Sequence, residues 1–195
     1  MQKAILYIVA LLFVVSCGST SETTKKLEIG DFYQGGIIFY LDESGQHGMV
    51  CSKKDISSNM PWYRGSFFDV NARGRGIGSG EMNTTLIIAA IVAKDEKFYN
   101  YAAEQCQSLT ALDAHGKVKG GWYLPSIDEL RLMYENKDAI NTRALQLGGE
   151  AFKQNTYWSS TEANYLWAWF VDFRNGRRSN TGKIIKMFVR PVRSF

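Results

Sequence analysis

The sequence has few of the residues that build catalytic or metal sites. It contains only two histidines, His47 and His115, and each stands beside a glycine in a turn-like segment. Neither has a cysteine, aspartate or glutamate at metal-ligand spacing, so we interpret both as solvated loop residues. No nucleophile motif supports Ser-His-Asp or Cys-His catalysis. We therefore expect a protein that is not an enzyme and that needs no cofactor.

Phosphate-binding motifs are also missing. The glycine-rich stretch from Arg73 to Gly80 has no Gly-Lys-Ser or Gly-Lys-Thr after it, and no strand is apparent before it. We predict a long surface loop here. The sequence gives no indication of a nucleic-acid partner.

The chain begins with an apolar run that is too short to span a membrane comfortably. Lys3 precedes the run, and Val14-Val15-Ser16-Cys17 at its end resembles a lipobox. We predict a lipoprotein signal peptide over residues 1–16, a lipidated Cys17 with a flexible tether over 17–28, and one domain over 29–195. An ordinary signal peptide with an incidental cysteine is the alternative. Gly18 after the cysteine favours the outer membrane, on its periplasmic or cell-surface face.

Cysteine is scarce, with three in the whole chain. Export implies an oxidising compartment for the remaining two, Cys51 and Cys106. One disulfide and two buried free thiols are both compatible with the sequence.

The order of predicted elements indicates an α+β fold. We expect a hairpin from Gly36–Leu41 and Met49–Cys51, then helices over Thr84–Ala93, capped by Asn83, and over Tyr99–Leu109. A loop and short helix should follow in Asn136–Gly149. The last forty residues read as strands: Tyr157–Ser160, an alternating strand from Trp167 to Phe173, the turn Asn175-Gly176, and a closing strand over Lys183–Arg193 that contains Pro191.

The clearest local signal is the junction from Gly120 to Leu130, an extended run that turns directly into a helix. Ser126 is an N-cap candidate, and Glu129 three residues later completes a capping box. We expect both residues to act in folding, not in ligand contact.

Three separated motifs make the chain resemble one bacterial surface family, that of the C-terminal domain of the Legionella collagen-like adhesin. The motifs are Trp122-Tyr123-Leu124-Pro125-Ser126-Ile127-Asp128-Glu129-Leu130, Tyr157-Trp158-Ser159-Ser160-Thr161-Glu162 and Val189-Arg190-Pro191-Val192-Arg193. Residues 29–40 also look like the family's usual opening. The resemblance implies a C-type-lectin-like fold, related to the formylglycine-generating-enzyme branch. In that fold the N- and C-terminal strands pair in an antiparallel terminal sheet, which would bring Ile37–Tyr40 beside Phe188–Val192.

The resemblance implies adhesion, since the namesake binds sulfated glycosaminoglycans through this domain. The enzymatic branch uses a reactive cysteine pair near the C-terminus, whereas no cysteine follows Cys106. The calcium motifs of true C-type lectins are also absent, and the spacing of Glu162, Asn164 and Asp172 matches no established calcium loop.

Acidic residues are missing from the C-terminal end: all nineteen lie at or before Asp172. The bases that follow are Arg174, Arg177, Arg178, Lys183, Lys186, Arg190 and Arg193. We expect Arg190 and Arg193 to pair internally with acids such as Glu129 or Glu162. Arg174, Arg177, Arg178 and Lys183 flank the turn, and we predict that they bind an anionic ligand.

Aromatic residues are plentiful in the same region. Trp167 and Trp169 should share one face, either in the core or as a sugar-stacking platform, whereas Trp122 and Trp158 should be packing residues. Taken together, the sequence predicts a lipid-anchored envelope module that binds an anionic or sulfated polysaccharide through a basic hairpin. The alternative is an interaction lipoprotein whose partner is an envelope protein.

Overall fold

The computed structural model describes residues 26–95 and 100–195. The predicted signal peptide, Cys17 and most of the predicted tether lie outside the described residues. In the part of the chain that is described, no helix is long and apolar enough to cross a membrane.

The first sheet joins the two ends of the domain. Its antiparallel strands are β1 (Phe32–Tyr33), β2 (Gly36–Leu41), β3 (Gly48–Cys51) and β11 (Val192–Ser194), in the order β1-β2-β3-β11. The predicted N-terminal hairpin is confirmed. The expected pairing of Ile37–Tyr40 with Phe188–Val192 is wrong, because β1 occupies one edge of β2 and β3 the other. The C-terminal strand pairs with β3 instead, with Val192 opposite Cys51.

The second sheet has the order β4-β10-β7-β8-β9. Its strands are β4 (Ser57–Pro61), β7 (Thr156–Glu162), β8 (Trp167–Asp172), β9 (Arg177–Gly182) and β10 (Lys186–Val189), and only β10 and β7 run parallel. The predicted closing strand is split: β10 ends at Val189 and β11 begins at Val192, so the chain changes sheets around Pro191. Proline has no N–H for a sheet ladder, which makes it suited to this crossover. A short third sheet pairs β5 (Ala111–Leu112) with β6 (Val118–Lys119).

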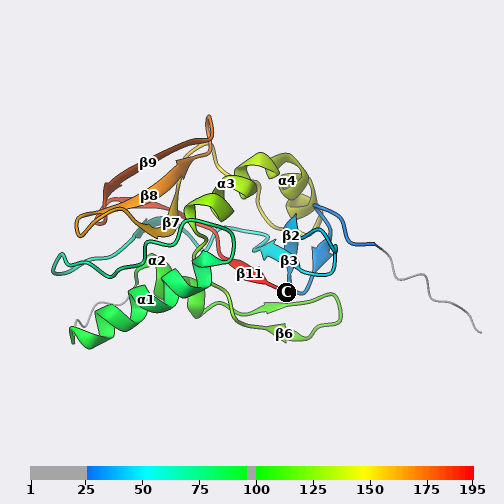
Figure 1. Ribbon diagram of the computed structural model, residues 1–195. Coiled ribbons are helices and arrows are strands. Elements are labelled where there is room, and N and C mark those ends of the chain that lie inside the picture. The colour runs from blue at the N-terminus through cyan, green and yellow to red at the C-terminus, as the bar shows by residue number, and fades with distance from the viewer. Residues whose placement is uncertain (1–25, 96–99) are drawn as a thin grey trace, which may run out of the picture.

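The described helices are α1 (Ser79–Ala93), α2 (Ala102–Gln107), α3 (Ile127–Glu135) and α4 (Lys137–Gln146). In Figure 1, α1 and α2 lie below β7, β8 and β9 of the second sheet, whereas α3 and α4 lie above β2 and β3 of the first sheet. The predicted N-cap at Asn83 is wrong, because α1 begins at Ser79 with Gly78 as its cap residue. Asn83 lies inside the helix, where its amide donates to the Gly74 carbonyl at 2.6 Å and accepts from the Gly74 N–H at 3.0 Å.

Two large hydrophobic clusters form the core. One packs the first sheet, α3 and α4 against β7 and β8, and includes Cys51; the other packs α1 and α2 against the second sheet, and includes Cys106. Of the two alternatives for the cysteines, the structure has two free, buried thiols. Trp122 and Trp158 are buried, which confirms their predicted packing roles.

Candidate ligand-binding surface of the C-terminal hairpin

The three sequence motifs meet at the start of α3. The predicted capping box is present: the Ser126 hydroxyl accepts from the Glu129 N–H at 3.3 Å, and the Glu129 carboxylate accepts from the Ser126 N–H at 2.8 Å. Tyr123 exchanges two backbone hydrogen bonds with Val192, and the Ser160 N–H donates to the Pro125 carbonyl at 2.7 Å. The motifs therefore form a shared scaffold at this junction.

Glu129 also closes the glycine-rich loop onto this scaffold. The other oxygen of its buried carboxylate accepts from the N–H groups of Gly78, at 2.8 Å, and Gly80, at 3.2 Å. A Cβ on Gly80 would collide with this carboxylate and with the Leu124 carbonyl, which explains the glycine. Burial raises the pKa of Glu129, while the backbone donors act in the opposite direction. The predicted surface loop over Arg73–Gly80 is confirmed as far as Gly78, since Ser79 and Gly80 begin α1. The N–H groups of Gly78 and Gly80 are already used by a protein carboxylate.

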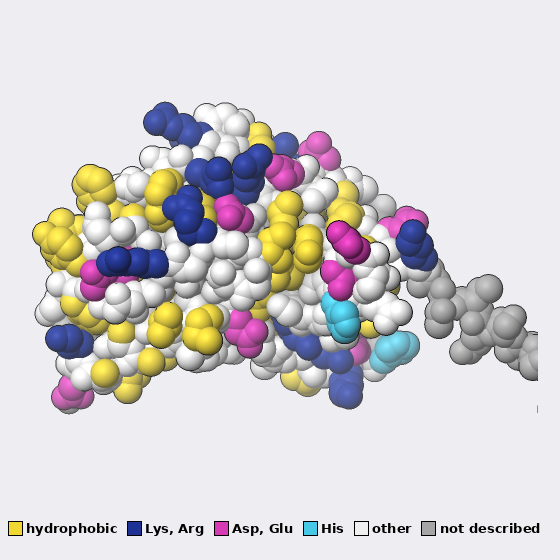
Figure 2. All heavy atoms as spheres, viewed as in Figure 1, with side chains coloured by type: hydrophobic (Ala, Val, Ile, Leu, Met, Phe, Trp, Pro, Cys, Tyr) yellow, Lys and Arg dark blue, Asp and Glu magenta, His cyan; other side chains and the backbone are white. Residues whose placement is uncertain are grey.

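The basic hairpin forms as the sequence predicts. β8 and β9 pair from Trp167 opposite Gly182 to Asp172 opposite Arg177, and Asn175-Gly176 lies in the turn between them. Gly176 has a φ of 75°, and the Tyr134 ring fills the space where a Cβ would stand. Both constraints favour glycine. In Figure 2, Lys and Arg side chains gather with acidic ones over the region where Figure 1 places β8, β9 and α3.

The predicted ligand residues do not form one patch. Arg177 and Arg178 are consecutive in β9, so their side chains leave opposite faces of the strand. Arg178 donates to the carboxylate of Asp128 on α3 at 2.6 Å. It borders a groove of about 350 Å³ that is lined by Ile77, Asp128, Arg131, Leu132, Glu135 and Arg178.

Arg174 and Arg177 line a different groove, of about 200 Å³, with Thr156, Phe170, Asp172 and Ser179. The Arg174 guanidinium makes a bidentate contact with Asp172, with N to O distances from 2.7 to 3.1 Å, and holds the pKa of that carboxyl below its usual value. The guanidinium of Arg177 has no hydrogen-bond or ion-pair partner among the described residues, and the residue is exposed. This groove therefore presents one cation bound to an acid and a second, exposed cation that makes no salt bridge within the described part of the chain, although its charge also lowers the pKa of Asp172 on the neighbouring strand.

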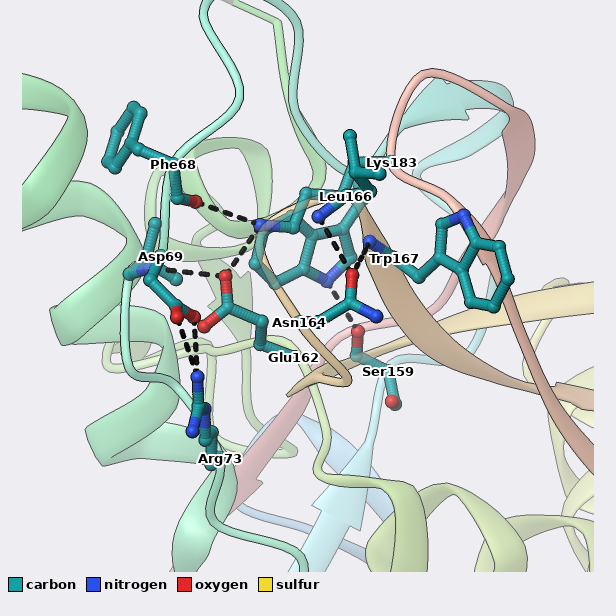
Figure 3. Close-up of polar contacts among 11 residues, drawn as sticks. Phe68, Asp69, Arg73, Ser159, Glu162, Asn164, Leu166, Trp167 and Lys183 are labelled. Carbon is teal, nitrogen blue, oxygen red and sulfur yellow. Dashed lines mark hydrogen bonds and ion pairs between the residues drawn. The ribbon is translucent and has the colours of Figure 1, made fainter.

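The prediction for Lys183 is wrong, because its side chain is fully buried. Its ammonium lies 2.5 Å from a carboxylate oxygen of Glu162, donates to the Phe68 carbonyl at 3.2 Å, and lies 4.8 Å from the centre of the Trp62 ring (Figure 3). Burial lowers the pKa of Lys183 and raises the pKa of Glu162, whereas the contact between the two groups opposes both shifts. Lys183 is an internal ion-pair partner.

The oxygen atoms considered for calcium are engaged elsewhere. Glu162 binds Lys183, Asp172 binds Arg174, and the Asn164 side chain accepts from the N–H groups of Leu166 and Trp167. Across residues 26–95 and 100–195, no group of three histidine, cysteine, aspartate or glutamate side chains could hold a metal ion.

Arg190 is buried and paired internally, as expected, but its partner is Asp55 at 2.7 Å and not Glu129 or Glu162. Its guanidinium also lies 4.0 Å from the centre of the Phe152 ring. Arg193 donates to the side-chain oxygen of Gln34 at 2.8 Å, an amide partner in place of the expected acid. Neither residue contributes to the groove of Arg174 and Arg177.

Trp167 and Trp169 share a face of β8 but differ in exposure. Trp167 is 48% exposed, whereas the guanidinium of Arg75 lies 4.4 Å from the centre of the half-buried Trp169 ring. They are therefore neither buried together nor exposed together. Thr156, Phe170 and Ser179 also line the groove of Arg174 and Arg177, and none of them was predicted from the sequence. The period of two along a strand places Ser179 on the same face as Arg177, but Thr156 and Phe170 follow only from the strand register.

Comparisons with known proteins assign the chain to a family. The family model of the Lcl C-terminal domain matches residues 54–193. The fold is similar to that of a fimbrial protein from Bacteroides ovatus ATCC 8483, with a TM-score of 0.59 and 16% sequence identity over 85% of this chain and 48% of that one. The chain thus spans about half the length of the fimbrial protein. No curated protein matches the sequence. The chain belongs to the Lcl C-terminal domain family.

Proposed function

We propose that this protein is an adhesin-like surface module that binds anionic or sulfated glycans in the groove of Arg174 and Arg177. Membership of the Lcl C-terminal domain family and a fold similar to that of a fimbrial protein support a surface, adhesin-like role. The observation that carries the glycan proposal is the exposed Arg177, whose guanidinium has no side-chain partner among the described residues and stands beside Arg174 at the groove.

The chemistry of the groove suits a sugar that carries a negative group. A guanidinium offers paired N–H donors in a plane that matches the oxygens of a sulfate or carboxylate. Thr156 and Ser179 supply hydroxyl groups, and Phe170 supplies an apolar wall. A volume of about 200 Å³ is below the usual range for a complete small-molecule site. We therefore infer that one sugar unit of a longer chain enters the groove while its neighbours lie across the hairpin.

A glycan array tests this proposal. The chain from Lys26 onward should bind sulfated or uronate-containing glycans in the presence of a chelator, and Arg177→Gln should reduce these signals. Arg73→Gln is the matched control, because Arg73 is equally a surface arginine but pairs with Asp69 in the glycine-rich loop. Loss of signal in the control with retention in Arg177→Gln would place the site in the loop. No signal for any acidic glycan near physiological salt would contradict glycan binding and favour the second candidate function, binding to an envelope protein.

The second candidate is an interaction module for an envelope protein, and the groove beside Arg178 favours it. That groove combines the apolar side chains of Ile77 and Leu132 with charges of both signs. Such a mixture is common in protein interfaces, where apolar centres have polar rims. Capture of one defined envelope protein, abolished by a change at Ile77, would support this candidate.

We also propose that Cys17 is acylated and holds the domain at the outer membrane, and that the protein binds without catalysis or a cofactor. The lipobox-like sequence before Cys17 supports the anchor. A C-type-lectin-like classification is part of the same proposal. It is supported by the sheet that contains both β1 and β11, the first and last described strands.

A further inference from the structure

Three loop segments meet at the end of the second sheet where β8 begins and β9 ends. They are residues 64–68, 163–167 and 182–186, and we call them the apolar tip. Lys183 ties them together: its N–H donates to the Leu166 carbonyl at 3.0 Å, its ammonium donates to the Phe68 carbonyl, and its own carbonyl accepts from the Trp62 N–H at 3.0 Å. The tip is therefore a fixed surface, built on the buried ion pair in Figure 3.

The apolar tip exposes large hydrophobic side chains. Five of them are between 43% and 53% exposed: Phe67, Tyr165, Trp167, Ile184 and Ile185. Figure 2 shows hydrophobic side chains projecting at the end of the molecule where Figure 1 places the start of β8 and the end of β9. Single exposed apolar residues are ordinary, but several on adjoining loops mark an interaction surface.

The exposed charges of the three segments have one sign, and the neighbouring Asp69 is paired with Arg73. The three segments contain Arg64, Lys183 and Lys186 and no acidic residue. Lys183 is buried, whereas Arg64 and Lys186 are exposed beside the apolar side chains. The tip thus combines an apolar centre with exposed cations, and it is complementary to a surface that is apolar inside and negatively charged outside.

We propose that the apolar tip docks on the surface of an anionic lipid bilayer. Trp167 and Tyr165 are residue types that favour the interface between water and hydrocarbon, Ile184, Ile185 and Phe67 suit shallow insertion, and the cations suit anionic headgroups. A sugar fits less well, because Ile184 and Ile185, which lie in the same tip as the aromatic rings, offer neither a ring for stacking nor a hydrogen-bonding group. The polar side chains that could bind sugar hydroxyl groups already have partners within the protein: Asn164 accepts from the N–H groups of Leu166 and Trp167, and Lys183 pairs with Glu162.

This docking goes beyond the proposed glycan function and does not depend on it. The described chain starts near β1, at the opposite end of the molecule from the tip (Figure 1). Fully extended, the chain between Cys17 and Lys26 reaches at most roughly 30 Å. An acylated Cys17 would keep the domain close to a bilayer, and the tip would add a second contact at the other end.

Vesicle binding tests the proposal with the chain from Lys26 onward, which contains every element and core cluster described above. The chain should sediment with vesicles of phosphatidylcholine and phosphatidylglycerol, and brominated acyl chains should quench its tryptophan fluorescence. Trp62, Trp122 and Trp158 are buried and Trp169 is half-buried beneath Arg75, so the quenching should report Trp167.

Ile184→Ser with Ile185→Ser should weaken vesicle binding roughly tenfold, since two apolar side chains no longer leave water. Arg64→Gln with Lys186→Gln should weaken it by a similar factor only when phosphatidylglycerol is present. Val92→Ser with Leu145→Ser is the matched control, because both residues are exposed apolar side chains on other elements. Arg177→Gln should leave the quenching of Trp167 unchanged, which separates this docking from glycan binding.

Absence of sedimentation and quenching with anionic vesicles would overturn the proposal, as would an equal loss in the control variant. A third result would also overturn it: the wild-type chain binds no vesicle, and Ile184→Ser with Ile185→Ser abolishes self-association or the glycan-array signal. The tip would then bind a second copy of the chain or a sugar.

Discussion

The buried pair of Lys183 and Glu162 allows a sharp prediction about stability. Both side chains have no exposed surface. Lys183→Met keeps the length and much of the packing of the lysine but removes its charge. The Glu162 carboxylate would then stay buried without its cation, while the Val70 N–H still donates to it at 3.1 Å. Removing one partner of a buried ion pair costs about 3–5 kcal/mol. We expect Lys183→Met to lower the free energy of unfolding by about this amount.

The double variant Lys183→Met with Glu162→Gln separates the charge effect from packing. Glutamine keeps an acceptor for the Val70 N–H without a buried charge, so most of the lost stability should return, to within about 1–2 kcal/mol of the wild type. Urea denaturation of the three proteins measures both effects. A loss below about 1 kcal/mol in Lys183→Met would show that the pair is not buried as described. A folded Lys183→Met that loses glycan binding would restore Lys183 as a ligand residue.

Three further predictions concern the cap, the hairpin and the anchor. Ser126→Ala should lower the free energy of unfolding by roughly 0.5–2 kcal/mol and leave the glycan affinity of the folded fraction unchanged, so lost binding at unchanged stability would contradict its structural role. Asp172→Asn should raise glycan affinity in a titration, because it releases Arg174. Wild-type affinity should stay flat between about pH 5 and 8, since Arg174 lowers the pKa of Asp172 and the carboxylate remains charged there. The ion pair of Asp172 and Arg174 stabilises the fold fully at pH values above the unfolded-state pKa of Asp172. This stabilisation is lost as the pH falls through the lower folded-state pKa of that carboxyl. Cys17→Ser should move the protein out of the detergent-extracted membrane fraction, and wild-type fractionation would rule out the lipid anchor.

Local rules explain what the sequence predicted well. The Ser126 cap with Glu129 and the turn at Asn175-Gly176 each depend on residues within a few positions of one another, and both are present in the structure. The predicted helix over Thr84–Ala93 exists but starts earlier. Asn83 fits an N-cap by its type, yet its amide is used by Gly74 on the preceding loop, and Gly78 caps the helix.

Partners distant in sequence explain what could not be predicted. Lys183 resembles its exposed neighbours in sequence, and its burial depends on Trp62 and Phe68, more than one hundred positions earlier in the chain. The burial of Trp62 could not be predicted either. Trp62 directly follows β4, a polar edge strand that is recognised only through its pairing with β10. The division of Arg177 and Arg178 between two grooves follows from strand alternation, but only the register with β8 and the contact with α3 show which groove each one meets.

The most direct test of the proposed function is heparin affinity as a function of salt for the wild type, Arg177→Gln and Arg178→Gln. The two variants remove the same charge from neighbouring positions whose side chains lie on opposite faces of β9. By analogy with nucleic-acid binding, affinity should fall steeply with salt, and Arg177→Gln should weaken binding and reduce the slope by about one. Arg178→Gln should stay close to the wild type. Weakened binding in Arg178→Gln together with wild-type binding in Arg177→Gln would contradict the groove of Arg174 and Arg177 as the glycan site.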